Sequence, residues 1–249
     1  MNNTLRHGLN VLQHLASTTE SFAVSGLAEA LSLPKSQVHR LLQGLVEDGW
    51  VVQDPDRRYR IGLKPLELSS ALLAHLPLRR AALPIVRQLT IDTGYDVILA
   101  QLVDGAALVL VGEYASGRQQ DPATAVGRRL ALHSSACGQL LAGMLPTDEQ
   151  ARLLARAPFP AYSPLTRTTA EAVQAAWTTA RRNGVAVQRG ENGIHTASLA
   201  VAVRDEAQRV VAALGIALPV DACDEPTEHL LTTRLHTAAD AITRPGAQP

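Results

Sequence analysis

The stretch L-A-E-A-L-S-L-P-K-S-Q-V-H-R-L-L-Q-G-L-V-E-D-G-W-V-V-Q-D-P-D-R-R-Y-R, residues Leu27–Arg60, decides the fold of the N-terminal part of the chain. It predicts two short helices separated by a Ser-Leu-Pro turn, and then two β-prone runs on either side of Asp54-Pro55-Asp56. In the second helix the apolar residues Val38, Leu41, Leu42 and Leu45 follow the spacing i, i+3, i+4, i+7. This order of elements predicts a winged helix-turn-helix.

The polar face of the second helix carries cationic and hydrogen-bonding side chains near its start: Lys35, Ser36, Gln37, His39 and Arg40. A recognition helix contacts base edges and phosphates with side chains of these types. Arg57 and Arg58 are expected at the tip of the wing, free to reach phosphates or a minor groove. An ordinary solvated helix would show a similar polar face, but the adjoining turn and wing favour contact with double-stranded DNA.

Local signals set the expected ends of the two helices. Ser25 is predicted to cap the first helix and Ser32 the second, because serine side chains accept hydrogen bonds from free N–H groups at helix starts. Gly49 is predicted to end the second helix in a left-handed conformation.

The bulk composition indicates a folded chain of two domains. The chain has 249 residues, of which 46% are hydrophobic and 18% charged, and its net charge is zero. This balance argues against a protein that is basic throughout, so a nucleic-acid contact has to come from a local patch. Two cysteines do not make a disulfide scaffold, and no segment is apolar enough to span a membrane. We therefore expect a cytoplasmic protein that does not contact the membrane.

The remainder of the chain predicts an α+β fold. A continuous helical pattern over 66–76 indicates a linker helix ended by Pro77. Beyond it, β-rich runs joined by Asp104-Gly105 predict a hairpin, and three later strands complete an antiparallel sheet with helices. The expected domains are a winged helix-turn-helix at 1–63, a linker helix at 64–77, and an antiparallel-sheet domain at 78–249.

Several segments, in this order and spacing, resemble the IclR family of bacterial transcription regulators. They are L-P-K-S-Q-V-H-R-L-L-Q-G-L-V-E-D-G-W-V, Y-R-I-G-L, V-G-R-R-L-A-L-H-S-S-A-C-G-Q-L-L-A, G-V-A-V-Q-R-G-E-N-G-I-H-T-A-S-L-A-V-A-V-R-D and V-V-A-A-L-G-I-A-L-P. The resemblance implies a GAF-like effector-binding domain after the linker. It also implies a homodimer or homotetramer that binds a palindromic operator under the control of a small molecule.

The chain departs from the family pattern at several positions. Gln37 stands where family members commonly carry Thr, and Gln139 follows Gly138 where a Lys is common. An amide can pair bidentately with adenine, so the operator sequence is expected to differ. Gln188 replaces an acidic residue, and Thr196 aligns with a Cys.

The expected effector site lies against the sheet. Its candidate residues are Tyr95, Tyr114, Ala136, Cys137, Gln188, Thr196, Gly215 and Ala217. Gly215 and Ala217 align with positions that are commonly Ser in the family, so two hydroxyls are missing. An unpaired carboxylate in an apolar pocket costs several kcal/mol, and we therefore expect an effector that is larger or more apolar than glyoxylate or pyruvate.

Two other functions compete with this interpretation. One is an enzyme that acts on a small substrate through the region His133–Cys137, although no G-x-S-x-G elbow supports it and helix capping explains the residues better. The other is a regulator whose sensor domain is vestigial. The histidines and cysteines show no paired spacing typical of metal ligands, so we expect no metal. For a transcription regulator we also expect no cofactor and no catalytic residues.

Overall fold

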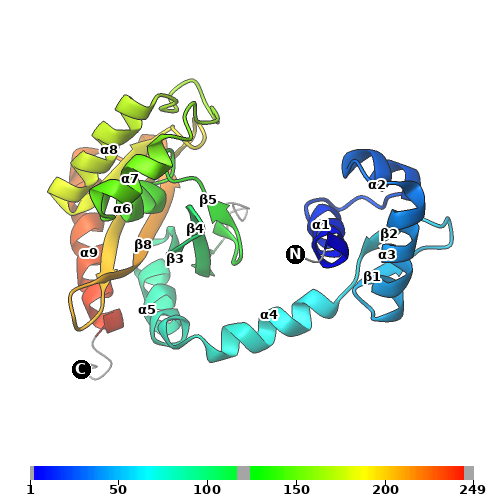
Figure 1. The fold of residues 1–249 in the computed structure, drawn as a ribbon. Coiled ribbons are helices and arrows are strands. Elements are labelled where there is room, and N and C mark those ends of the chain that lie inside the picture. Colours follow the sequence, from blue (N-terminus) through cyan, green and yellow to red (C-terminus); the bar gives the residue numbers. More distant parts are fainter. Residues whose placement is uncertain (1–2, 117–123, 244–249) are drawn as a thin grey trace. The chain divides into compact units, whose positions relative to one another are not determined.

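The computed structural model describes residues 3–116 and 124–243. The chain divides into two compact units, residues 1–75 and 76–249, and each is considered by itself. Figure 1 shows the helices and strands of both units.

The first unit is a winged helix-turn-helix. It contains α1 (Asn3–Ala16), α2 (Val24–Ala30), α3 (Lys35–Glu47), and the two-stranded wing β1 (Val51–Gln53) and β2 (Tyr59–Ile61). The wing is antiparallel, with Val51 opposite Ile61 and Gln53 opposite Tyr59. One apolar core joins the helices to the wing; its fully buried side chains include Val11, Leu15, Leu27, Val38, Leu42 and Val51. The predicted apolar stripe of α3 therefore faces the core.

The ends of the helices differ in part from the sequence prediction. Ser25 and Ser32 cap neither helix, because α2 begins after Ala23 and α3 begins after Pro34, with no side-chain cap on either. Ser32 instead has a φ of 53° in the tight turn between the helices, and the Pro34 carbonyl accepts from the N–H groups of Gln37 and Val38. Gly49 ends the helical segment with a φ of 75°, as predicted.

The helix α4 (Lys64–His75) follows the wing and contains no buried residue. The Lys64 Nζ donates to the Asp48 carbonyl oxygen at 3.0 Å and ties the start of α4 to the end of α3. The second unit then begins with α5 (Pro77–Thr93), whose first residue is the proline predicted to end the linker helix. Pro84 lies inside α5.

The second unit is built on an antiparallel sheet, as predicted. The sheet has six strands where the sequence predicted five, because the strand Arg129–Leu130 has only two residues and gives no alternating pattern of its own. Its strands are β3 (Asp96–Val103), β4 (Ala106–Glu113), β5 (Arg129–Leu130), β6 (Val185–Arg189), β7 (Thr196–Arg204) and β8 (Val210–Pro219). Their order in the sheet is β5-β4-β3-β8-β7-β6. Asp104 and Gly105 both have positive φ, at 46° and 74°, which is the geometry of the predicted two-residue hairpin turn.

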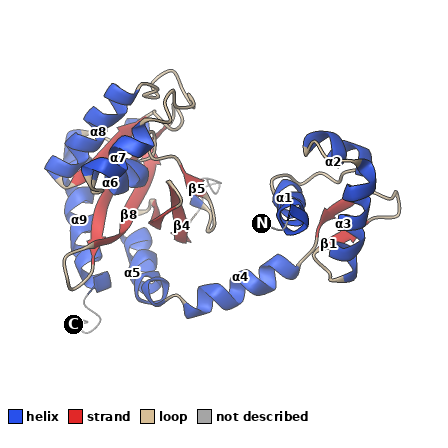
Figure 2. Ribbon diagram, in the orientation of Figure 1, coloured by secondary structure: helices blue, strands red, loops and turns tan. Residues whose placement is uncertain are grey.

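Helices cover both faces of this sheet (Figure 2). On one face α5 and α9 (Glu225–Thr243) pack on a core that contains Val86, Leu99, Leu214 and Leu235. On the other face α6 (Ala136–Gly143) and α8 (Ala170–Asn183) pack on a core around Trp177, which is fully buried. The helix α7 (Thr147–Leu154) and the short helix η2 (Val220–Ala222) complete the unit. Within the described residues, no helix is long and apolar enough to cross a membrane.

Candidate functional site

A cavity lies between the sheet and the start of α6. Its volume is about 50 Å³, several times the volume that one water molecule needs. Its lining consists of Ile98, Thr124, Leu130, Ser135, Ala136, Cys137, Gln188, Asn192, Thr196, Ala197, Ser198, Leu199, Gly215, Ile216 and Ala217. None of these described lining residues carries a charged side chain.

The structure brings six of the eight predicted effector residues to this cavity. They are Ala136, Cys137, Gln188, Thr196, Gly215 and Ala217. The two tyrosines do not line it. Tyr95 packs against the core under α5 and α9, on the opposite face of the sheet. Tyr114 lies beside Gly112: its hydroxyl oxygen is 3.8 Å from the position that a Cβ atom on Gly112 would occupy. The sequence predicted both tyrosines on neighbouring strands of the sheet, but it did not show toward which face of the sheet each side chain points.

The predicted effector residues did not include four polar residues of the lining: Thr124, Ser135, Asn192 and Ser198. Ser198 had a usable signal, because it lies two residues after Thr196 on the same strand and therefore on the same face. Asn192 had no such signal, since it lies in the connection between β6 and β7 and only tertiary packing brings it to the cavity.

The polar side chains of the lining are already connected by hydrogen bonds. Gln188 Nε2 donates to Ser198 Oγ at 3.0 Å, and Gln188 Oε1 accepts from the Glu191 N–H at 3.0 Å. Ser198 Oγ is thus an acceptor in this bond, and its own hydroxyl hydrogen remains available to a ligand. The Asn192 Oδ1 accepts from Ser134 Oγ at 3.0 Å, which leaves the Asn192 amide hydrogens available as donors.

The start of α6 adds backbone donors to the same wall. Ser135 caps the helix, since its Oγ accepts from the Gly138 N–H at 3.0 Å. The N–H groups of Ala136 and Cys137 lie in the first turn, where the helix itself supplies no acceptor. The cavity therefore combines an apolar interior with a set of hydrogen-bond donors at one wall.

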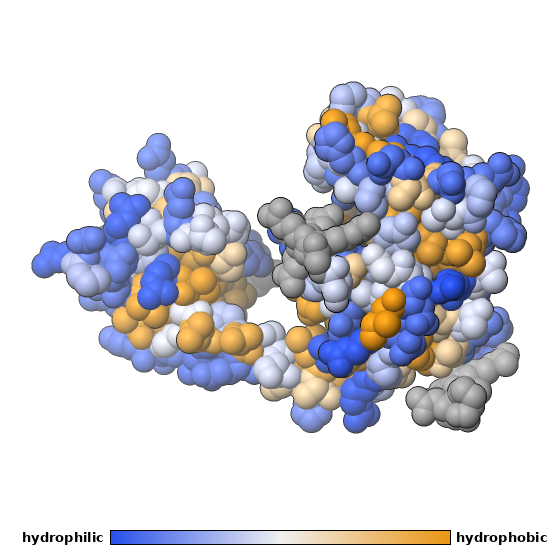
Figure 3. Space-filling model, turned by 180° about the vertical axis from the view of Figure 1, so that it is seen from behind, coloured by the Kyte–Doolittle hydropathy of each residue, from blue (hydrophilic) through white to orange (hydrophobic). Residues whose placement is uncertain are grey.

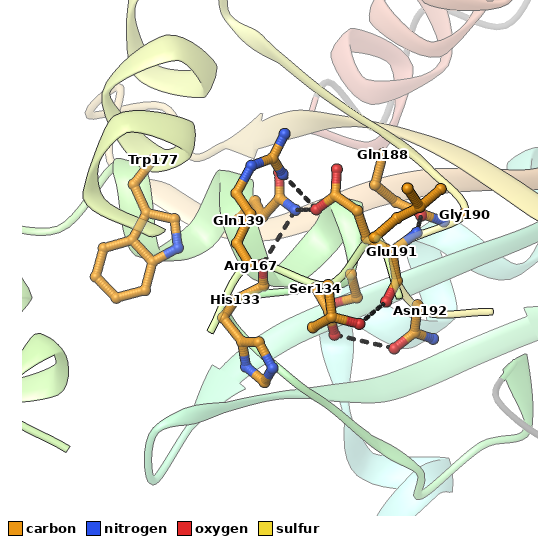
Figure 4. A network of polar contacts seen from close by, with 12 residues as sticks. His133, Ser134, Gln139, Arg167, Trp177, Gln188, Gly190, Glu191 and Asn192 are labelled. Atoms are coloured by element: carbon orange, nitrogen blue, oxygen red, sulfur yellow. Dashed lines mark hydrogen bonds and ion pairs between the residues drawn. The ribbon is translucent and has the colours of Figure 1, made fainter. Parts of the chain in front are cut away.

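A polar network holds the rim of the cavity (Figure 4). The Glu191 side chain is 7% exposed, and its Oε2 accepts from Gln139 Nε2 at 2.8 Å and from the Arg167 guanidinium. The Glu191 carbonyl accepts from Thr166 Oγ1 at 2.6 Å, and Ser163 Oγ donates to the Gly190 carbonyl at 2.6 Å. These bonds tie the segment before α8 to the β6–β7 connection that carries Asn192.

Burial raises the pKa of the Glu191 carboxyl, while the charge of Arg167 and the hydrogen bond from Gln139 act in the opposite direction. Arg167 thus supplies a cation to this network. The sequence at Gly138-Gln139 had suggested that a cation was missing here, and the structure shows Gln139 as a neutral donor to the same carboxylate.

The region His133–Cys137 is not arranged as a nucleophile with its base. The His133 ring stacks on Phe159 and Tyr162, with centroid distances of 5.0 and 5.5 Å, and its Nε2 lies 2.9 Å from the Pro160 carbonyl oxygen. Burial lowers the pKa of His133. Burial also raises the pKa of the Cys137 thiol to about 12, so the thiol is protonated rather than a reactive thiolate. Among the described residues, no group of three or more His, Cys, Asp or Glu side chains could hold a metal ion.

The start of α3 presents a polar surface. Lys35, Ser36, His39 and Arg40 are exposed, while Val38 between them is fully buried in the core. Arg57 is exposed at the wing tip, where its φ is 59°.

Two of the residues that were predicted to face DNA have partners within the first unit. Gln37 is half-buried, and its Nε2 lies 2.7 Å from Nδ1 of His7 on α1. Arg58 was expected to be free at the wing tip, and this expectation is wrong. Its Nε donates to the Ser21 Oγ at 3.0 Å and to the Ser21 carbonyl at 3.1 Å, because the strand β2 runs beside the segment between α1 and α2.

Comparison with known protein families gives matches to both units. The model of the IclR helix-turn-helix domain matches residues 4–55, and the model described as bacterial transcriptional regulator IclR C-terminal matches residues 70–244. The chain is 25% identical over 242 residues to the HTH-type transcriptional regulator XynR of Escherichia coli, which covers 97% of this chain and 96% of the relative. It is 29% identical over 216 residues to the HTH-type transcriptional repressor AllR of Klebsiella pneumoniae, which covers 86% of this chain and 79% of the relative.

Solved structures show the same fold. A putative IclR transcriptional regulator from Silicibacter is 26% identical, with a TM-score of 0.81 over 99% of this chain and 98% of that one. An IclR homologue from Microbacterium hydrocarbonoxydans, crystallised with 4-hydroxybenzoate, is 25% identical, with a TM-score of 0.80 over 96% of this chain and 97% of that one. These relatives are transcription regulators and not enzymes. The α+β architecture, the helix-turn-helix and the family-wide matches agree, and the chain belongs to the IclR family of bacterial transcription regulators.

Proposed function

We propose that the chain binds a palindromic DNA operator as a homodimer or homotetramer, and that a small molecule in the cavity of the second unit changes its affinity for that operator. The observation that carries the proposal is the exposed polar start of α3, held on the core by the buried Val38 and Leu42. A helix anchored on one face and cationic on the other is what major-groove binding requires.

The proposed DNA contacts come from α3 and the wing. Lys35, Ser36, Gln37, His39 and Arg40 would reach base edges and phosphates from the start of α3, and Arg57 would contact the backbone from the wing. Arg58 would act differently, because its bonds to Ser21 fix the wing to the segment before α2.

The surface of the first unit supports self-association. Leu63, Leu66, Leu68 and Leu72, at and within α4, are 57–77% exposed, and Leu5 and Leu9 of α1 are also exposed. Figure 3 shows hydrophobic residues at the surface of this unit among hydrophilic ones. A second copy of the chain would cover such leucines, and the two-fold symmetry of a dimer would match a palindromic operator.

The proposed effector has an apolar body and one end that accepts hydrogen bonds. The donors available at the cavity are the Ser198 hydroxyl, the Asn192 amide and the first N–H groups of α6. No charged side chain of the described lining would pair with a small anion. The 4-hydroxybenzoate bound by the Microbacterium homologue is an example of this chemistry. The effector can shift the protein between two states only by its different affinity for them, and α4 is the segment through which the change would reach α3.

Selection from a random double-stranded DNA library, followed by affinity measurements on the selected site, tests the DNA-binding part. We expect the double variant Lys35→Ala/Arg40→Ala to lose specific binding. The slope of log affinity against log salt should fall by about 0.9 for each lost phosphate contact. The double variant Arg152→Ala/Arg181→Ala, in the second unit, serves as a control with the same loss of charge. Unchanged binding by the α3 variant would overturn the assignment of α3.

Calorimetric titration tests the effector part with three probes: glyoxylate, pyruvate and 4-hydroxybenzoate. We expect the aromatic acid to bind more tightly than the two small acids, and Ser198→Ala to weaken its binding. Nanomolar-to-micromolar binding of glyoxylate or pyruvate would contradict the proposed effector class. If no small molecule is found that both binds the chain and changes its affinity for DNA, a vestigial sensor domain is favoured.

A further inference from the structure

The hydrogen bond between Gln37 and His7 connects the recognition helix to a helix that lies outside the helix-turn-helix motif. Gln37 Nε2 and His7 Nδ1 are 2.7 Å apart, although the two residues are 30 positions apart in the chain. Both residues are half-buried, while their neighbours Lys35 and Ser36 are exposed. Among the described residues, Gln37 is the one member of the proposed base-reading set on α3 whose side chain has a hydrogen-bond partner.

Helix packing fixes the position of His7. Val11 and Leu15 of α1 are fully buried in the core of the first unit. A Cβ added to Gly8 would lie 3.9 Å from Leu41 Cδ2, and Leu41 is one helical turn after Gln37 on α3. The two helices are thus in contact beside the hydrogen bond, and this packing holds the backbone of His7 next to Gln37.

The contact determines what Gln37 can offer to a base. A carboxamide has one acceptor oxygen and two N–H donors, and its two ends are nearly identical in shape. In the His7 tautomer that carries its hydrogen on Nε2, Nδ1 is an acceptor. Gln37 Nε2 then donates one hydrogen to Nδ1, and the amide is held in one of its two orientations. One N–H and the Oε1 atom then remain for other partners, which is the donor–acceptor pair that the major-groove edge of adenine complements. Without His7 the amide is free to turn over and to present the opposite order.

We propose that His7 is a positioning residue for base recognition, which fixes the orientation of the Gln37 carboxamide and thereby sharpens the preference for one base pair of the operator. This inference rests on the proposed function of α3 in DNA binding. It assigns a role in sequence specificity to α1, whose buried residues Val11 and Leu15 pack in the core of the first unit.

The experiment uses the full chain and a random double-stranded DNA library. The selected site and its single base-pair variants are then measured by fluorescence anisotropy at one fixed salt concentration. Gln37→Ala is expected to reduce discrimination at one base pair by about 5- to 100-fold, the range expected for one bidentate contact. His7→Ala is expected to reduce discrimination at that same base pair by about 3- to 10-fold, since the amide contact is retained but is no longer pre-organised.

Two variants separate positioning from a merely structural effect. The double variant His7→Ala/Gln37→Ala should discriminate no worse than Gln37→Ala alone, because His7 acts through Gln37. His7→Asn should restore most of the preference, because the asparagine Oδ1 can accept a hydrogen bond near the place of Nδ1. Asn10→Ala, at an exposed position one turn further along α1, is the matched control and should retain the wild-type preference.

The outcomes distinguish the inference from the proposed function. If the wild-type chain selects no sequence from the library, the proposed DNA binding fails and the inference fails with it. If Gln37→Ala changes no base preference, DNA binding stands and the inference is overturned. Uniform weakening of all sites by His7→Ala, or an unchanged preference, would also overturn it.

Discussion

The Sγ atom of Cys137 lies 2.6 Å from the position that a Cβ atom on Gly215 would occupy. The thiol of α6 thus fills the space of a side chain on β8, and both residues line the cavity of the second unit. A hydroxyl at position 215 is therefore not simply missing from this chain. Its place is taken by a protonated thiol from the facing helix, which is larger, more polarisable and a weaker hydrogen-bond donor.

This relationship predicts that the two positions are coupled. Gly215→Ala should destabilise the second unit by about 1–3 kcal/mol, the usual cost of overpacking. The same substitution should cost less in a Cys137→Ala background, where the nearest remaining neighbour of the added Cβ is the Leu199 carbonyl oxygen at 3.2 Å. Urea denaturation of the four proteins of this double-mutant cycle measures the coupling. Gly193→Ala is the control, because its added Cβ would come no closer than 3.4 Å to Thr196 Oγ1. Equal costs of Gly215→Ala in both backgrounds would show that the thiol does not occupy that space.

The buried carboxylate of Glu191 makes Arg167 important for stability. Removal of one partner of a fully buried ion pair costs about 3–5 kcal/mol. The Arg167 side chain is 37% exposed, so solvent reduces this cost, and we expect Arg167→Ala to lower the free energy of unfolding by about 1–3 kcal/mol. Arg152→Ala removes a similar bond to Asp148 between side chains that are 77% and 66% exposed. Its expected cost is below about 1 kcal/mol. Equal costs for the two variants would contradict the importance of the Glu191 network.

The raised pKa of Glu191 predicts a pH dependence of stability. The folded-state pKa lies above that of an unfolded glutamate, mainly because of burial. Between the two pKa values the folded state binds more protons, so this contribution to stability is complete below the unfolded pKa and is lost as the pH rises through the folded pKa. The melting temperature of the wild type, relative to Glu191→Gln, should therefore decrease with rising pH. The loss should move to higher pH in the Arg167→Ala background, since Arg167 lowers the pKa of Glu191. A relative melting temperature that increases with pH would contradict the assigned direction.

The exposed leucines of α4 predict a variant with impaired self-association. Leu68 and Leu72 are one helical turn apart and are 57% and 61% exposed. Leu68→Glu/Leu72→Glu should weaken the proposed homodimer by about 10-fold or more, because each copy would bury two charges at the proposed interface. Glutamate is a good helix former, so α4 itself should persist. Sedimentation velocity over a concentration series measures the change. Ser70→Glu, which adds a charge at another exposed position of α4, controls for charge alone. Dimerisation unaffected by the double substitution would place the interface elsewhere.

Much of the architecture followed from local sequence patterns. The spacing of Val38, Leu41, Leu42 and Leu45 defined α3 and its buried face, and Asp104-Gly105 located the β3–β4 turn. These features depend on residues close together in the chain, so periodicity and turn chemistry were sufficient. The helix caps could not be predicted in this way, because Ser25, Ser32 and their neighbours fit several local geometries.

The candidate sites show the same division. Six of the eight predicted effector residues line one cavity. Tyr95 lies on the opposite face of the sheet, and Tyr114 lies outside the lining. Ser198 could have been found from the period of its strand. Asn192 could not, because its position depends on the network around Glu191.

The sequence by itself determined the helix-turn-helix, the α+β class and the β3–β4 hairpin, because these rest on short-range hydrophobic periods and turn residues. Only the tertiary structure decided which polar groups have partners. It paired Gln37 with His7, Arg58 with Ser21 and Glu191 with Arg167, and it placed the Cys137 thiol against Gly215. Each of these pairs joins residues at least 24 positions apart. Contacts of this length depend on how helices and strands pack, and no local pattern encodes them.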